Sequence, residues 1–248
     1  MPGMSRPAAA EREEHLIVAS PGRDIAVTAI TVVLTAAIFA AVASQGVLAH
    51  IQHLDNAWLR LMVSNRTAPV TAFAKFLNLL GLVYVTLPVR IAIAGYLALR
   101  RRWWHLAAFV AAIASSEALI GTLKAIYGRA RPTGSLVATS GASFPSGHSI
   151  AATVTVVAAV IALVPPGRRR AWWGAGAVAF SVLMALSRAY LAAHWLSDAI
   201  AGVLLGTSCA LVMALAVHGL RIWREGPDGP EAVAGRAEGR SPPVVRAA

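Results

Sequence analysis

Charged residues are scarce in this sequence. Asp, Glu, Lys and Arg make up 13% of the 248 residues, whereas a typical soluble domain has about 25%. Hydrophobic residues reach 57%, and 22 basic residues outnumber 11 acidic ones. This composition excludes an ordinary soluble domain and indicates an integral membrane protein. The basic residues lie in short clusters between apolar runs, which argues against nucleic-acid binding.

Cysteine is almost absent. The one cysteine, Cys209, lies inside an apolar run. A single cysteine excludes a disulfide framework and a cysteine-based metal site. We therefore expect Cys209 to be a small buried apolar residue.

Six apolar runs have about the length needed to cross a hydrocarbon core of ~30 Å at 1.5 Å per helical residue. They cover residues 25–48, 76–99, 103–123, 149–165, 171–189 and 196–220. The sequence thus predicts an all-α fold, a six-helix transmembrane bundle over residues 25–220. Residues 1–24 and 221–248 are expected to be cytoplasmic tails, the second of them disordered because it is rich in Gly, Pro and charge.

Arginine placement predicts the orientation of this bundle. Clusters at 100–102 and 168–170, with Arg221 and Arg224, mark the cytoplasmic side. The connections near residues 49–75, 124–148 and 190–195 then face the periplasm or exterior of the cell's inner (plasma) membrane. In the first of them, apolar residues spaced at helical intervals between Ile51 and Met62 predict a short helix on the outer membrane surface. That helix either lines a lipid access path or is a simple connector.

Three short polar stretches fall in or beside the outward connections: KAIYGRARP (124–132), PSGH (145–148) and SRAYLAAHWLSD (187–198). They supply the three cations Lys124, Arg131 and Arg188, which suit the oxygens of a phosphate group. The Ser146-Gly147 pair offers a hydroxyl and backbone N–H groups at the start of a predicted helix, a natural anion site. A lone Arg-Pro is more often structural, but three such blocks on one membrane face favour phosphate chemistry.

Two histidines and an aspartate complete the pattern. On a helix, His194 and Asp198 would share a face, so that the carboxylate fixes the imidazole tautomer and leaves the other nitrogen free to attack. His148 comes from a different stretch. One histidine would attack phosphorus while the other protonates the leaving oxygen.

The three stretches resemble the signature of the type 2 phosphatidic acid phosphatase (PAP2) superfamily. That signature is Lys, six residues, Arg-Pro; then Pro-Ser-Gly-His; then Ser-Arg, five residues, His, three residues, Asp, and this sequence fills every position. The resemblance implies that His194 is a nucleophile forming a phosphohistidine, Asp198 orients it and His148 is the general acid. Because the cations and the start of the helix already suit the phosphate and carboxylates are scarce, we expect no metal and no cofactor. The phosphate-binding residues that the resemblance implies are Lys124, Arg131, Ser146, Gly147 and Arg188.

The implied activity is hydrolysis of a lipid phosphate or diphosphate headgroup, such as undecaprenyl diphosphate, phosphatidic acid or phosphatidylglycerol phosphate. The expected partners are membrane lipids and the lipid substrate, with no nucleic acid; the oligomeric state stays open. A phosphotransferase with the same site and a non-catalytic headgroup binder or transporter are the alternatives.

Three further features remain open at this stage. Glu117 is a carboxylate inside a predicted membrane helix, with a functional or a structural role. Arg129 is expected to be accessory. The loose cluster His50, His53 and Asp55 is far more typical of an interfacial helix than of a metal site.

Overall fold

The computed structural model describes residues 17, 18 and 20–225. The predicted tails over 1–16 and 226–248 therefore lie outside the described residues. Within the described part, eight helices and no strands are present, which confirms the all-α prediction. The helices are α2 (Pro21–Ala43), α3 (Gln45–Ser64), α4 (Ala68–Leu80), α5 (Val83–Leu99), α6 (Trp103–Tyr127), α7 (Gly147–Leu163), α8 (Arg168–Tyr190) and α9 (Leu196–Glu225).

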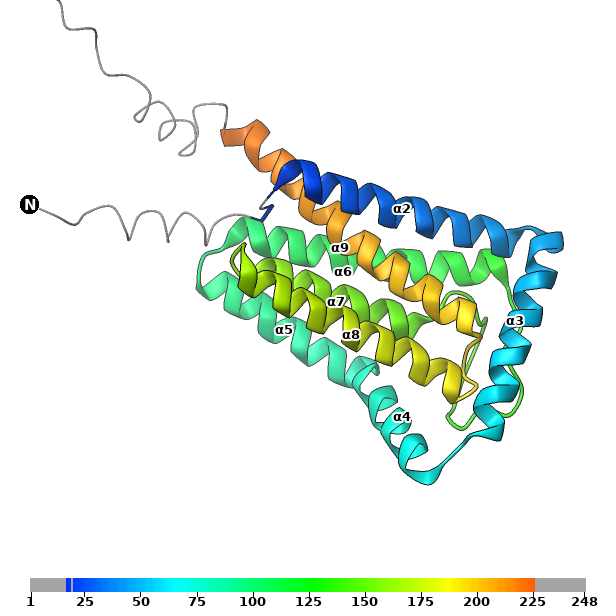
Figure 1. The fold of residues 1–248 in the computed structure, drawn as a ribbon. Helices are drawn as coiled ribbons and strands as arrows, with labels where there is room; N and C mark the ends of the chain where they lie inside the picture. The colour runs from blue at the N-terminus through cyan, green and yellow to red at the C-terminus, as the bar shows by residue number, and fades with distance from the viewer. Residues whose placement is uncertain (1–16, 19, 226–248) are drawn as a thin grey trace, which may run out of the picture.

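The long helices form a bundle, and α3 crosses one of its ends (Figure 1). Helix α2 begins and α9 ends at the opposite end. The end that α3 covers also holds the start of α7 and the two connections that precede α7 and α9 (Figure 1). All three polar stretches thus meet at one end of the bundle.

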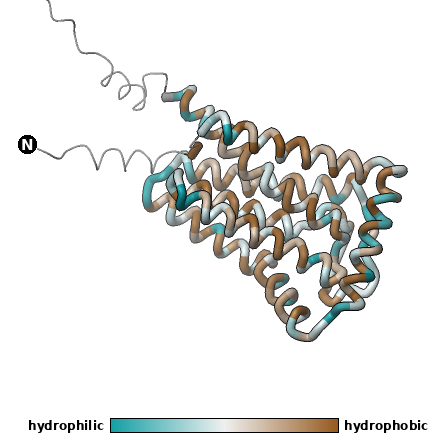
Figure 2. The backbone as a smooth tube through the Cα atoms, in the orientation of Figure 1, coloured by the Kyte–Doolittle hydropathy of each residue, from teal (hydrophilic) through white to brown (hydrophobic). Residues whose placement is uncertain are grey.

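Three described helices are long and apolar enough to cross a membrane: α2, α6 and α9 as far as Arg224. The pair α4 and α5 would make a fourth span, bent by 50° at its break. Apolar residues line the flanks of these helices, and hydrophilic residues gather toward the ends of the bundle (Figure 2). Helix α7 is apolar but has only 17 residues. Helix α8 is not among the three either, and it carries arginine in its first and last turns.

Two of the predicted runs are divided in the structure. The run 25–48 breaks at Ser44, so its last residues belong to α3. The run 76–99 breaks at Gly81 and Leu82, between α4 and α5. Both breaks lie inside continuous apolar sequence, which is why hydropathy alone did not reveal them.

Helix α7 packs against α6, α8 and α9, and two glycines let α9 approach it closely. A Cβ atom on Gly202 would lie 2.7 Å from Ser149 Cβ and 2.8 Å from the Ser146 carbonyl oxygen. A Cβ on Gly206 would lie 2.8 Å from the Ile150 carbonyl oxygen. Small residues at such a contact bring helix backbones together in lipid. The start of α9 is thereby held against the Pro-Ser-Gly-His turn. Cys209 is buried in the same core, as predicted.

Helix α3 is longer than the predicted surface helix, and its inward face carries a polar residue. Asp55 is its buried residue, whereas Leu54 is 69% exposed and Leu61 is 52% exposed. The predicted apolar set is therefore divided, because Ile51 and Met62 pack on the core while Leu54 and Leu61 lie on the outer side of α3. The side that faces the bundle presents a carboxylate to the polar stretches.

Candidate active site

Every sequence-predicted site residue lies at the end of the bundle that α3 covers. Lys124 is in the last turn of α6, and Arg131 follows in the connection 128–146. Ser146 and Gly147 begin α7, and Arg188 is in the last turn of α8. His194 lies in the connection between α8 and α9, and Asp198 is in the first turn of α9.

The imidazole of His194 is held in one tautomer by the backbone. Its Nδ1 lies 2.8 Å from the carbonyl oxygen of Ser143. Because a carbonyl only accepts hydrogen bonds, Nδ1 carries the proton. The unprotonated Nε2 then faces Arg131, whose Nη1 is 3.2 Å away. His194 thus offers a lone pair beside a fixed positive charge.

His194 precedes α9, so the expectation that it shares a helix face with Asp198 was wrong. The backbone N–H groups of Ala193 and His194 instead donate to the carbonyl oxygen of Arg188, at 3.1 and 3.3 Å. This tight turn carries the imidazole. Two side chains four residues apart lie close together in this turn, as they would on a helix. The sequence spacing alone does not distinguish the turn from the helix.

Asp198 acts on His194 mainly through Ser143. Its Oδ2 lies 3.7 Å from Nδ1 of His194, longer than a hydrogen bond. The same oxygen accepts a hydrogen bond from the Ser143 hydroxyl and another from the backbone N–H of Trp195 at 2.9 Å. Asp198 therefore orients the carbonyl that binds the imidazole, and it also caps α9. The direct carboxylate–imidazole hydrogen bond expected from the sequence is not formed.

Arg129 joins Asp198 to α3 in a buried charge network. Its guanidinium donates to Asp198 Oδ1 at 2.6 Å and to Asp55 Oδ2 at 2.7 Å. Gln52 and Ser197 accept two further hydrogen bonds from it, each 2.7 Å long. Asp55 also binds the backbone N–H and the hydroxyl of Ser197, at 2.9 and 2.6 Å. One arginine thus stabilises two buried carboxylates at the base of the site.

This network settles the geometry of the His50, His53 and Asp55 cluster. Asp55 is engaged by Arg129 and Ser197. His50 Nδ1 lies 3.0 Å from the carbonyl oxygen of Gly46 within its own helix. No group of three His, Cys, Asp or Glu side chains suited to a metal occurs in the described part of the chain.

The cations surround the approach to His194. Lys124 Nζ donates to the carbonyl oxygen of Ala142 at 2.7 Å, and Arg131 Nη2 donates to the same oxygen at 3.1 Å. Arg131 also donates to the carbonyl oxygens of Ser140, Gly141 and Ala193. Arg188 is buried, and its Nη1 binds the side-chain oxygen of Asn78. Three positive charges therefore lie at this end with no carboxylate bonded to any of them among the described residues.

The Pro-Ser-Gly-His turn places His148 on the other side of the site. Ser146 N–H donates to the Asp198 carbonyl oxygen at 3.1 Å, which joins α7 to α9. The His148 Nε2 is buried without a hydrogen-bond partner among the described residues. A Cβ atom on Gly81 would lie 2.6 Å from Cδ2 of His148. Only glycine at the α4–α5 break leaves room for this imidazole.

Burial lowers the pKa of His194 from the ordinary 6.5 to about 4, although Asp198 opposes the shift. Folded His194 is then neutral at pH 7, and its unfolded form gains a proton below about pH 6.5. Proton uptake by the unfolded state lowers stability as the pH falls from 6.5 toward 4.

We expect wild type to lose stability over this pH window more steeply than the His194→Gln variant. The additional slope approaches about 1.4 kcal/mol per pH unit, because one proton is linked to unfolding. The measurement is unfolding in detergent micelles at several pH values, with His148 unchanged in both proteins. Parallel pH profiles for the two proteins would contradict a depressed His194 pKa.

Sequence reasoning missed four residues of this site: Gln52, Asp55, Asn78 and Ser143. Asn78 had a signal, because it is a polar residue in an apolar run. Gln52 and Asp55 are three residues apart on one helix face, which was a second signal. Ser143 contributes a backbone carbonyl to His194, and side-chain identity does not reveal such a contact.

Comparison with known proteins finds one matching family and related solved structures. Residues 105–222, which include α7, α8 and most of α6 and α9, match the family model of the PAP2 superfamily. No curated protein sequence matches the chain. A transmembrane PAP2-type phosphatidylglycerolphosphate phosphatase from Bacillus subtilis is 25% identical, with a TM-score of 0.65, over 78% of this chain and 95% of that one.

LpxE from Aquifex aeolicus shares the fold at 22% identity, with a TM-score of 0.54, over 64% of this chain and 94% of that one. The family match covers all the residues of the three polar stretches, and the solved structures share the bundle that brings them together. Over residues 105–222 the chain is thus similar to the PAP2 superfamily, and it shares its fold with both solved structures.

Proposed function

We propose that this protein is an integral membrane lipid phosphatase that works through a phosphohistidine on His194. One observation carries the proposal. His194 Nδ1 donates to the Ser143 carbonyl at 2.8 Å, so Nε2 is unprotonated and accepts a hydrogen bond from Arg131 Nη1 at 3.2 Å. A nucleophile of fixed tautomer, held next to cations for the phosphoryl oxygens, suits attack on phosphorus.

In the first step, the lone pair of Nε2 bonds to phosphorus while the bond from phosphorus to the leaving oxygen breaks. Lys124, Arg131 and Arg188 neutralise the phosphoryl oxygens, together with the Ser146 hydroxyl and the first N–H groups of α7, which lack intrahelical acceptors. His148 donates a proton to the leaving oxygen. The leaving group is the lipid alcohol or, from a diphosphate, the lipid monophosphate.

In the second step, water attacks the phosphohistidine and the bond from phosphorus to Nε2 breaks. His148, now neutral, accepts the proton of this water. Inorganic phosphate leaves, and His194 and His148 return to their starting states. Asp198 and Ser143 keep the ring of His194 oriented through both steps, since they hold its Nδ1 side.

The proposed setting follows from the fold and the arginine clusters. The active-site end faces the periplasm or exterior, both chain ends lie in the cytoplasm, and six segments cross the inner membrane, with α4 and α5 as one bent span. The candidate substrates are phosphatidylglycerol phosphate, phosphatidic acid and undecaprenyl diphosphate. Phosphatidylglycerol phosphate has support from the Bacillus subtilis relative, which is a phosphatidylglycerolphosphate phosphatase.

Phosphate release from these three lipids in detergent micelles tests the proposal. We expect release from at least one lipid and a labelled phosphohistidine trapped by rapid acid-free quenching. Label transfer to an added alcohol in preference to water would indicate a phosphotransferase. Absence of release from all three lipids would leave a headgroup binder or transporter as the better reading.

We expect activity to survive a metal chelator. The charges that face the phosphate in the proposed mechanism come from Lys124, Arg131 and Arg188, so EDTA removes nothing that the chemistry uses. The measurement is phosphate release before and after dialysis against EDTA, expected to agree within about twofold. Loss of release that a divalent cation restores would contradict this mechanism.

A further inference from the structure

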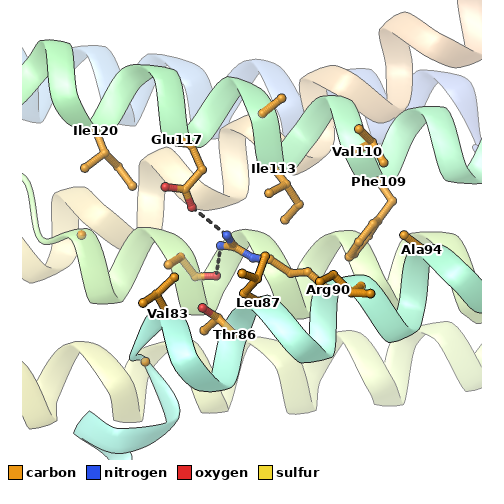
Figure 3. Close-up of a pocket in the computed structure, with 15 residues that line it drawn as sticks. Val83, Thr86, Leu87, Arg90, Ala94, Phe109, Val110, Ile113, Glu117 and Ile120 are labelled. Atoms are coloured by element: carbon orange, nitrogen blue, oxygen red, sulfur yellow. Dashed lines mark hydrogen bonds and ion pairs between the residues drawn. The ribbon is translucent and has the colours of Figure 1, made fainter.

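A groove of about 600 Å³ lies between α5, α6 and α7 (Figure 3). Gly81 and Gly147 line one end of it, and Ala94 and Phe109 line it farther along the bundle. Gly81 packs on the His148 ring, and Gly147 begins the turn that holds the phosphate in the proposed mechanism. The groove therefore begins beside Gly147 of the proposed site and runs away from it.

The groove wall is apolar except near one ion pair. Arg90 of α5 and Glu117 of α6 meet there, with Nη1 of Arg90 2.7 Å from Oε1 of Glu117 (Figure 3). Arg90 is 11% exposed and Glu117 is 50% exposed. An ionised pair beside hydrocarbon carries a desolvation cost in free energy. Its presence there makes it a candidate functional site.

Arg90 is held rigidly but retains donors. Its Nε donates to Thr155 Oγ1 at 2.9 Å, and its Nη2 donates to the Ala151 carbonyl oxygen at 3.3 Å. With the bond to Glu117, these contacts use three of the five N–H groups of a guanidinium. Two N–H groups remain for an acceptor in the groove. A purely structural arginine that joins three helices does not need to line a groove that reaches the active site.

The distance of Arg90 from the proposed phosphate site, taken along the helices, indicates the chemical nature of that acceptor. Ala151 lies one helical turn from Gly147, or ~6 Å along α7, and Glu117 lies ~10 Å from Lys124 along α6. In phosphatidic acid, an ester carbonyl is about five single bonds of ~1.5 Å each from phosphorus, hence roughly 6 Å away. In phosphatidylglycerol phosphate the terminal phosphorus is about twice as many bonds away from the ester carbonyls. A polyisoprenoid diphosphate has only hydrocarbon at this depth and offers no acceptor there.

We propose that Arg90 is a specificity residue that binds an ester carbonyl of phosphatidic acid, whose acyl chains occupy this groove. The inference rests on the proposed phosphatase function and selects among its substrates. Glu117 positions the guanidinium, because its carboxylate fixes one edge of Arg90. The hydrogen bonds to Thr155 and Ala151 orient the rest of the guanidinium toward the groove.

The test compares phosphatidic acid with its diether analogue, which has the same chains and headgroup but no carbonyl groups. Phosphate release is measured in the same micelles for wild type and Arg90→Met. We expect wild type to prefer the diester in kcat/KM by about tenfold or more, the value of a hydrogen bond to a charged group. In Arg90→Met, the ratio of diester to diether rates should fall close to one.

The control is Lys75→Met, which removes an exposed cation from α4 at a position that does not line the groove. We expect this variant to keep the wild-type ratio. Equal wild-type rates on diester and diether would overturn the inference, and so would an unchanged ratio in Arg90→Met. The wild-type comparison decides the matter even if Arg90→Met does not fold. Wild type inactive on both lipids but active on undecaprenyl diphosphate or phosphatidylglycerol phosphate would overturn this inference and leave the phosphatase proposal standing. Inactivity on all of these lipids would count against the phosphatase proposal itself.

Discussion

His194→Ala is expected to abolish phosphate release, with a loss of at least about 10⁴-fold in kcat, the scale found when a covalent nucleophile is removed. The variant lacks the Nε2 lone pair that lies 3.2 Å from Arg131, and no other imidazole among residues 17, 18 and 20–225 has this position. Its headgroup-binding cations remain, so substrate should still bind. The measurement combines phosphate release with capture of labelled phosphoenzyme, and both should fall to background.

The matched control for this variant is His50→Ala, because His50 is an exposed histidine of α3 at the same end of the bundle. It should retain wild-type activity and labelling. Substantial release by His194→Ala would contradict the mechanism. So would a phosphohistidine mapped to another residue, and in that case His148 would become the candidate nucleophile.

Arg129→Met is expected to lower the free energy of unfolding by about 3–5 kcal/mol, which is typical of breaking a buried ion pair. The variant leaves Asp55 and Asp198 buried without the cation that both contact, at 2.7 and 2.6 Å. Activity should fall too, because Asp198 holds the Ser143 carbonyl that binds His194. The measurement is equilibrium unfolding in mixed detergent micelles.

The control is Arg131→Met, two residues away. The described contacts of Arg131 are backbone carbonyls and His194, with no carboxylate bond. We expect a stability loss of no more than about 1–2 kcal/mol, because no buried charge loses its partner. The kcat loss should be about 10²-fold or more, because a cation that faces the phosphoryl group is removed. Equal stability losses in the two variants would refute the proposed role of Arg129.

A double-mutant cycle sharpens this prediction. Asp55→Asn should be much less harmful in the Arg129→Met background than in wild type, because one unpaired carboxylate is then removed. Additive effects would mean that the two side chains do not interact energetically, although they lie 2.7 Å apart.

The helical class, the family signature and the gathering of the polar stretches at one end could be predicted from the sequence. These depend on local properties: the length of apolar runs, the positions of arginines between them, and the fixed spacing of motif residues. Tertiary structure decided which atoms meet. Asp55 contacts Arg129 across 74 residues, His194 contacts Ser143 across 51, and Arg188 contacts Asn78 across 110.

The sequence left Glu117 open, and only the structure showed that it pairs with Arg90 beside a groove. The physical reason is that helical periodicity constrains neighbours on one helix. Contacts between helices depend on how closely their backbones approach. Gly81 and Gly202 permit that approach here. A side chain at Gly81 would overlap His148, and one at Gly202 would overlap the Pro-Ser-Gly-His turn.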